Sequence, residues 1–219
     1  MSADTTWGAG LRWAFGARAW LGFFASLSDG RILLRHELTW LHKTEEQAAE
    51  DILAARVTWK IQNLRGGIYA NSDLWPEDEK DTGESRAETF ARAGVILRRG
   101  SKNRVNNFAR LRSWLAVKPR KTVAGNLLEP ASSLLVHPDC KYFLKTLPVL
   151  VSSEIEVDDV ATCEQEYPAF GASLYLMSRP LPSVAVQKPV PQPGTWGHAL
   201  RHVWHPPRRR LGADNVRLR

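Results

Sequence analysis

Three apolar runs near the start of the chain, separated by short polar turns, constrain the fold more than any other feature. The runs cover residues 11–15, 20–27 and 32–40, and Asp29 with Gly30 supplies the turn chemistry of a β-hairpin between the last two. Strands joined by so little chain pair antiparallel, because a parallel pair needs a long crossover. The sequence therefore predicts a three-stranded antiparallel meander.

Helix signals and short apolar segments alternate after this meander. Thr44 with Gln47, and Ser85 with Glu88, have the residue types and spacing of capping boxes, which satisfy free amides at the start of a helix. Apolar periodicity then predicts a helix from residue 45 to the glycines at 66 and 67, a strand over 68–70, a short helix up to Gly94 and a strand over 95–97. A helix that carries Phe108, Leu111 and Leu115 follows. The last predicted elements are a strand over 134–136 and helices over 140–147 and 172–177.

This element order predicts the α/β class. Parallel strands joined by crossover helices are covered on both faces, so we expect a mixed sheet, an antiparallel three-strand meander plus parallel strands, flanked by helices. The order resembles the ribonuclease H-like fold. Two stretches are less regular: residues 118–130 have no clear period, and the last helix is predicted to begin only at Ala172 because Pro168 and Gly171 are poor helix formers.

The charge balance favours a polyanionic partner. The chain has 30 Lys and Arg against 23 Asp and Glu, a net charge of +7, and cations that neutralise phosphates release condensed counterions. No apolar run reaches the roughly 18 residues of a membrane span, and the N-terminus lacks the pattern of a secretory signal. We therefore expect no membrane partner and a cytoplasmic location, with Cys140 and Cys163 as free thiols.

Composition divides the chain into two parts. Residues 8–180 carry the periodic patterns and form the predicted domain, whereas residues 181–219 are a basic tail rich in Pro and Arg, predicted to be extended or disordered. His198, His202 and His205 lie in this tail at a spacing that can bind a metal on a helix. The nearby prolines and the missing carboxylate partner favour a solvated tail instead.

Two motifs in register resemble the nuclease domain of bacteriophage terminase large subunits. Residues 83–94 match the form G-x-S-x-A-E-x-F-x-x-x-G, and residues 103–108 follow the family motif N-D-R-x-N-G-W. Asp159 and Thr162 fall where the family has an acidic D-x-D-T segment, and the resemblance covers the predicted domain, 8–180. The sequence contains no G-x-x-x-x-G-K-[ST] loop, so the ATPase motor of a complete terminase large subunit is expected to be missing.

The resemblance implies a phage or prophage protein in the cytoplasm of a bacterial host cell, with DNA as its partner. The family activity is the cutting of concatemeric viral DNA during packaging by two-metal hydrolysis. That chemistry needs carboxylates that converge on Mg²⁺ or Mn²⁺, because hard cations prefer oxygen ligands. Packaging proteins, namely a separate ATPase, the portal and the small terminase, are implied as further partners.

The family carboxylate positions fall on residues that do not hold a metal. The first falls on Arg12, a cation, and the second on Asn71, which offers one neutral oxygen. The third falls on Phe170 or Gly171, which carry no ligand atom. The resemblance therefore implies a domain without confident catalytic residues and without a resident cofactor, a pseudoenzyme in which Arg12 binds phosphate where a metal once did.

A shifted metal site is the alternative. Asp73 lies two residues beyond Asn71, which along a strand keeps the same face, and Glu166 stands near the third position. These two are the rescue candidates from a wider set of carboxylates that we interpret as turn and surface groups: Asp73, Asp139, Asp158, Asp159, Glu164 and Glu166.

A basic loop after the strand predicted at 95–97 is the candidate DNA contact, because loops at the carboxyl ends of strands are preferred ligand positions in open α/β sheets. A solvated loop fits the same residues. The predicted DNA-binding residues are Arg12, Arg98, Arg99, Lys102, Arg104 and Asn106.

Two functions therefore stay open from the sequence. The first is an inactive terminase nuclease-like domain retained for DNA binding or for contacts in the packaging complex. The second is an active endonuclease that depends on Mg²⁺ or Mn²⁺. A decaying prophage gene without a selected function is a third possibility.

Overall fold

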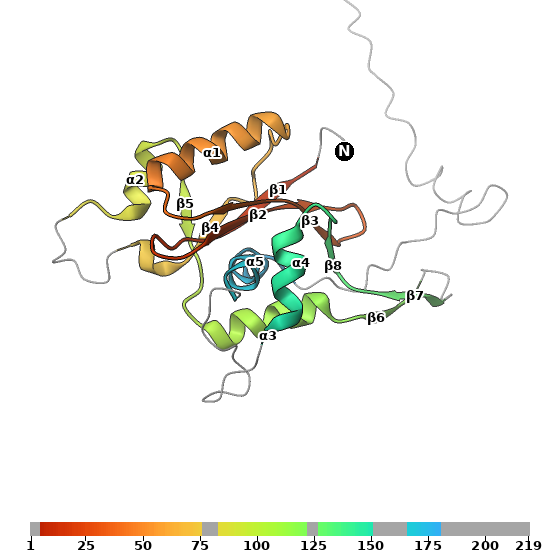
Figure 1. Ribbon diagram of the computed structural model, residues 1–219. Coiled ribbons are helices and arrows are strands. Elements are labelled where there is room, and N and C mark those ends of the chain that lie inside the picture. Colours follow the sequence, from red (N-terminus) through yellow and green to blue (C-terminus); the bar gives the residue numbers. More distant parts are fainter. Residues whose placement is uncertain (1–4, 76–82, 122–126, 151–165, 181–219) are drawn as a thin grey trace, which may run out of the picture.

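The computed structural model describes residues 5–75, 83–121, 127–150 and 166–180 (Figure 1). The helices and strands in chain order are β1 (Trp7–Arg12), β2 (Ala19–Ser26), β3 (Ile32–Trp40), α1 (Glu45–Thr58), β4 (Ile68–Ala70), the 3₁₀ turn η1 (Ser72–Leu74), α2 (Arg86–Arg92), β5 (Leu97–Arg99), α3 (Arg104–Leu115), β6 (Lys118–Lys121), β7 (Leu127–Ala131), β8 (Leu134–Val136), α4 (Lys141–Thr146), η2 (Leu147–Val149) and α5 (Tyr167–Met177).

One mixed sheet of six strands, in the order β5-β4-β1-β2-β3-β8, forms the centre of the domain. The meander β1-β2-β3 is antiparallel, whereas β4 runs parallel to β1, β5 parallel to β4, and β8 parallel to β3. Strands β6 and β7 pair as a separate hairpin. The predicted fold class is confirmed: this is the mixed sheet of a ribonuclease H-like domain.

Helices cover both faces of the sheet. Helices α1 and α2 lie over one face, and α3, α4 and α5 lie over the other (Figure 1). Strand β2 has seven buried residues out of eight, because a strand in the middle of a sheet covered on both sides has no solvated face. Each face has its own apolar core, with Trp13 and Phe90 in one and Trp20 and Phe143 in the other.

Helix α5 packs against β1 without side chains between the two backbones. A Cβ atom on Gly10 would lie 1.9 Å from the carbonyl oxygen of Gly171. The helix begins at Tyr167, so the prediction that it begins at Ala172 was wrong. Pro168 is tolerated in the first turn, where the N–H that proline lacks would have no partner within the helix, and Gly171 is the residue that allows the close contact.

Several other predicted boundaries differ from the structure. The first strand is Trp7–Arg12 rather than 11–15, because the two-faced sheet extends it toward the buried Trp7. Helix α1 ends at Thr58, well before the glycines at 66 and 67, because Lys60 adopts a positive φ of 55° that a helix does not permit. The irregular stretch 118–130 contains the pair β6 and β7, whose register shift obscures a simple period.

Most of the described tryptophans and one of the two cysteines are buried. Five tryptophans lie in the core, and Cys140 is a buried free thiol. Burial, the largest cause, raises the pKa of the Cys140 thiol to about 12. Cys163, the acidic segment around Asp159 and the tail 181–219 lie outside the described residues.

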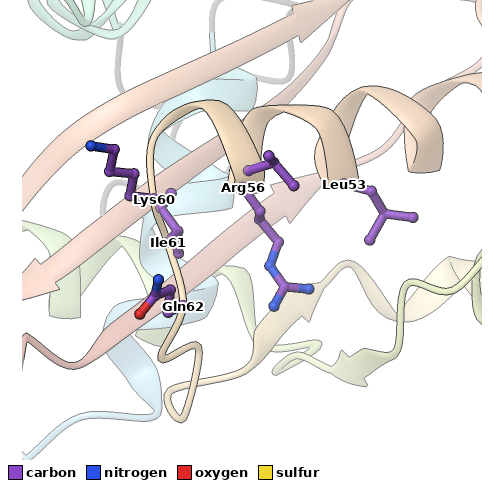
Figure 2. Close-up of a pocket in the computed structure, with 6 residues that line it drawn as sticks. Leu53, Arg56, Lys60, Ile61 and Gln62 are labelled. Atoms are coloured by element: carbon purple, nitrogen blue, oxygen red, sulfur yellow. The ribbon is translucent and has the colours of Figure 1, made fainter. Parts of the chain in front are cut away.

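An open pocket of about 440 Å³ lies at the end of α1 (Figure 2). Its lining residues are Leu53, Arg56, Val57, Lys60, Ile61 and Gln62. The segment that follows α1 bonds to the start of β1, where the Trp7 amide donates to the Asn63 carbonyl at 2.9 Å. The pocket is therefore near the amino end of β1 and apart from the residues singled out by the sequence. Of the helices that the structure describes, none is long and apolar enough to cross a membrane.

Candidate functional site

The parallel strands β1, β4 and β5 end at the same edge of the sheet, and the predicted site residues meet there. Arg12 is the last residue of β1, Asn71 follows β4, and Arg99 ends β5. The Gly100 amide donates to the Ala70 carbonyl at 2.8 Å, which holds the ends of β4 and β5 together. The carboxyl edge of parallel strands is the usual ligand position in such sheets.

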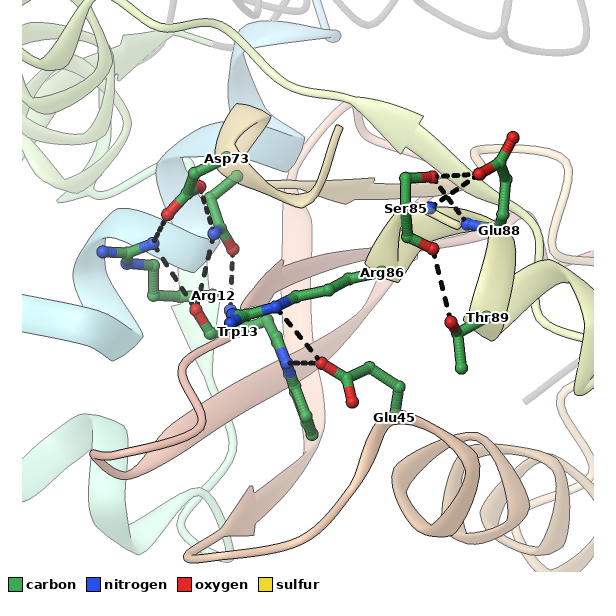
Figure 3. Close-up of polar contacts among 9 residues, drawn as sticks. Arg12, Trp13, Glu45, Asp73, Ser85, Arg86, Glu88 and Thr89 are labelled. Carbon is green, nitrogen blue, oxygen red and sulfur yellow. Dashed lines mark hydrogen bonds and ion pairs between the residues drawn. The ribbon is translucent and has the colours of Figure 1, made fainter. Parts of the chain in front are cut away.

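The Arg12 guanidinium lies between a carboxylate and two aromatic rings. Its Nη1 donates to Asp73 Oδ2 at 3.1 Å (Figure 3), and its central carbon lies 4.8 Å from the ring centroid of Tyr167 and 5.6 Å from that of Phe170. The Nε atom is buried and has no hydrogen-bond partner among the described residues. Arg12 is thus held in place at the position to which the family resemblance assigns the first carboxylate.

The Asn71 side chain forms hydrogen bonds with the backbone of Trp13, the residue that follows strand β1. Its Oδ1 accepts from the Trp13 amide at 2.7 Å, and its Nδ2 donates to the Trp13 carbonyl at 3.4 Å and to Asp73 Oδ1. A carboxylate at this position could accept from the amide but could not donate to the carbonyl. The neutral amide is therefore the side chain that suits both backbone groups of Trp13.

Asp73 is ionised by its neighbours. Burial acts to raise the pKa of its carboxyl, but the hydrogen bond from Asn71 and the positive charge of Arg12 outweigh it, and the pKa lies below its usual value. The side chain is 65% exposed. The prediction placed Asp73 on a strand, where it would share a face with Asn71; it lies instead in the 3₁₀ turn η1, which brings it beside Asn71 by a different route.

A second ion pair joins α3 to α5. Glu166, with a side chain that is 0% exposed, accepts from Arg104 Nη1 at 2.9 Å and from Nη2 at 2.6 Å, a bidentate contact. The Arg104 guanidinium lies 5.4 Å from the ring centroids of both Phe108 and Phe170. Phe170, one of the two positions to which the family resemblance assigns the third carboxylate, therefore lies under two arginine side chains.

Binding a metal here would require breaking these pairs. The described part of the chain contains no group of three or more His, Cys, Asp or Glu side chains that could hold an ion. Asp73 and Glu166, the two carboxylates predicted as spare metal ligands, each neutralise an arginine. A two-metal centre needs carboxylates that converge on cations, and these described side chains do not fit it.

The other predicted DNA contacts lie on the rim of the same edge. Arg98 and Arg99 belong to strand β5 and not to the loop in which they were predicted, because the strand is Leu97–Arg99 rather than 95–97. Both are exposed, as are Lys102 and Asn106. The structure thus places basic side chains around Arg12, on the strand and at the start of α3.

Hydrogen bonds from the helices of the opposite face support this edge. The indole Nε1 of Trp13 donates to Glu45 Oε1 at 3.0 Å, and Arg86 Nε lies 3.6 Å from the same oxygen (Figure 3). Both predicted capping boxes are present, at Thr44 and at Ser85. The starts of α1 and α2 are therefore fixed beside the residue that follows Arg12.

The sequence did not predict how the charged residues pair. Arg104 was expected to contact DNA and Glu166 to serve as a spare metal ligand, yet the two bind each other across 62 positions. Tyr69 and Tyr167 lie under guanidinium groups, and neither was predicted to contact an arginine. The aromatic residues near Arg98 and Arg99 were the one sequence signal for contacts between arginine side chains and rings.

Comparisons with known proteins give a likeness of fold. No protein-family model and no curated protein sequence matches this chain. Among solved structures, the chain is similar to the nuclease domain of the P22 large terminase, with a TM-score of 0.58 and 13% identity over 86% of this chain and 87% of that one.

It is also similar to the large terminase of a thermophilic bacteriophage, solved in complex with ADP, with a TM-score of 0.58 and 8% identity over 80% of this chain. The match spans 40% of that protein, so this chain corresponds to about two fifths of it.

Proposed function

We propose that this chain is a terminase nuclease-like domain of phage or prophage origin that binds the DNA backbone without hydrolysing it. One observation carries the proposal: at the end of β1, Arg12 forms an ion pair with Asp73 at the edge where a nuclease of this fold would hold its metals. The likeness to the P22 nuclease domain supports the origin of the domain, and the motifs at residues 83–94 and 103–108 support it independently.

The arginines suit a phosphate ligand. A guanidinium can bind two phosphate oxygens at once through its N–H edges, and an aromatic ring under its face does not compete for those N–H groups. Arg98 and Arg99 on the exposed edge strand, with Lys102 at the start of the next loop, extend the positive surface away from Arg12. Phosphate contacts of this kind fix a protein on DNA without reading its sequence.

Partners within a packaging complex belong to the same proposal. From the likeness to phage large terminases, we infer that packaging proteins act with this domain, namely a separate ATPase, the portal or the small terminase. The domain would then hold DNA in the complex while another chain moves it.

An active divalent-metal-dependent endonuclease is the alternative, and Asp73 and Glu166 are the residues that would carry it. Each carboxylate already binds an arginine, so metal binding would have to displace Arg12 from one and Arg104 from the other. Separating the buried Glu166 from Arg104 costs several kcal/mol, which opposes this alternative.

A plasmid-cleavage assay with calorimetry separates the two functions. We expect DNA binding by gel shift, no nicking of supercoiled plasmid with Mg²⁺ or Mn²⁺, and no heat of metal binding. Nicking that disappears in Asp73→Ala and persists in Asp139→Ala, an exposed carboxylate that also pairs with an arginine, would establish the endonuclease instead.

A further inference from the structure

Arginine side chains at the carboxyl edge are stacked on aromatic rings. The distances from guanidinium carbon to ring centroid are 4.8 Å for Arg12 over Tyr167, 5.9 Å for Arg98 over Tyr69, 5.8 Å for Arg99 over Trp75, and 5.4 Å for Arg104 over Phe108. A further contact of this kind, Arg18 over Tyr142, lies at the same edge on the other side of β1, because Arg18 precedes β2 where that strand pairs with the end of β1. The stacked pairs therefore gather where the DNA contact is proposed.

Two of the pairs lie on the edge strand of the sheet. Tyr69 is opposite Arg98 in the pairing of β4 with β5, and Ala70 is opposite Arg99, so the two arginines point to opposite faces. No strand covers the outer side of β5 in the described sheet. Arg98 and Arg99 are exposed while Tyr69 and Trp75 are half-buried, so each ring backs a cation that faces solvent.

A flat cation supported by a ring offers its other face to a second π system. Unpaired bases stack on arginine planes and on aromatic rings, and base stacking contributes roughly 1–3 kcal/mol per base in single-strand binding. Bases in a duplex are stacked on each other and expose only their edges and the phosphates. Arginines that bind phosphate alone would not need aromatic partners at each position.

We propose that this edge takes single-stranded DNA in preference to duplex DNA. The phosphates bind the N–H edges of the arginines, and the unpaired bases stack on the Arg98–Tyr69, Arg99–Trp75 and Arg12–Tyr167 pairs. This inference rests on the proposed DNA binding and adds the strand state of the ligand. The exposed rim at β5 and the half-buried Arg12 would then contact successive nucleotides.

Three fluorescent probes test the proposal on the full chain by anisotropy: an oligothymidine of about 20 nucleotides, a duplex of the same length, and an abasic deoxyribose-phosphate chain of the same length. The oligothymidine and the abasic chain have equal charge, so their difference measures stacking. We expect the oligothymidine to bind at least about tenfold more tightly than the abasic chain and several-fold more tightly than the duplex.

Two variants locate the effect. Tyr69→Leu and Tyr167→Leu are expected to weaken oligothymidine binding about fivefold each and to change duplex binding less than about twofold, because leucine keeps apolar volume and removes the ring. Tyr142→Leu, which alters the pair on the other side of β1 from β5, is the matched control and is expected to bind as the wild type.

Each result decides one of the two proposals. Equal affinity for the oligothymidine and the abasic chain would overturn the inference and leave DNA binding intact. Failure of all three probes to bind would overturn the proposed function itself. The probe comparison on the unaltered chain needs no variant, so the test holds even if a tyrosine variant folds poorly.

Discussion

Two ion pairs at the same edge of the sheet differ in the solvent exposure of their carboxylates. Arg104 and Glu166 form a bidentate pair in which the carboxylate is 0% exposed. Arg12 and Asp73 make a single contact at 3.1 Å, and the carboxylate is 65% exposed. In both pairs Phe170 lies under the guanidinium, so the difference lies in the carboxylates.

The comparison separates a structural role from a binding role. A buried charge that loses its partner is costly, so the Arg104–Glu166 pair holds the start of α5 to the start of α3. An exposed pair contributes little to stability, and water or phosphate can replace the carboxylate at low cost. Arg12, whose side chain is 18% exposed, is therefore the arginine whose carboxylate partner a ligand can replace, and Asp73 is its internal competitor.

The largest expected effect comes from breaking the buried pair. Glu166→Ala leaves the Arg104 charge without its carboxylate, and we expect the free energy of unfolding to fall by about 3 kcal/mol. Urea denaturation measures this loss, and Asp73→Ala, the same change in the exposed pair, is expected to cost less than about 1 kcal/mol. Equal losses for the two variants would contradict the distinction between the pairs.

Arg12 is expected to have the next largest effect, on DNA binding. Arg12→Ala should weaken binding about fivefold to tenfold at low salt and reduce the slope of log affinity against log salt by about 1, because one phosphate contact is lost. Arg35→Ala is the matched control, since Arg35 also pairs with an exposed aspartate. An unchanged slope in Arg12→Ala would exclude Arg12 from the interface.

Removing the charge of Asp73, which pairs with Arg12, should strengthen DNA binding. Asp73→Asn keeps the size of the side chain and releases Arg12, so we expect DNA affinity to rise about threefold. Asp139→Asn adds the same charge to the protein and should change affinity less than about 1.5-fold. If both variants gain equally, the effect is one of net charge and Asp73 does not compete for Arg12.

The smallest expected effect is that of divalent metal on the unaltered chain. A ligand that binds only the folded state raises the melting temperature, so a chain without a metal site should melt within about 1 °C of its control in roughly 10 mM Mg²⁺ or Mn²⁺. A clear rise that EDTA reverses would show that both carboxylates leave their arginines for a metal, and it would remove the contrast between the pairs.

Most of the fold could be predicted from local signals. The hairpin at Asp29 and Gly30, and the capping boxes at Thr44 and Ser85, depend on residues a few positions apart, and the structure confirms all three. Helix α5 was predicted poorly because its start is set by packing: Gly171 lowers helix propensity but permits the contact with Gly10. Tertiary packing outweighs propensity at such a position.

The sequence by itself determined the order of the helices and of the strands in the main sheet, the mixed sheet with helices on both faces, and the edge at which the candidate site residues gather. These follow from turn chemistry, capping and periodicity, which act over a few residues. Only the tertiary structure decided which charges meet, because Arg12 and Asp73 are 61 positions apart and Arg104 and Glu166 are 62 apart. Pairing over such separations depends on how the strand ends and α5 are placed in space, and no local pattern encodes it.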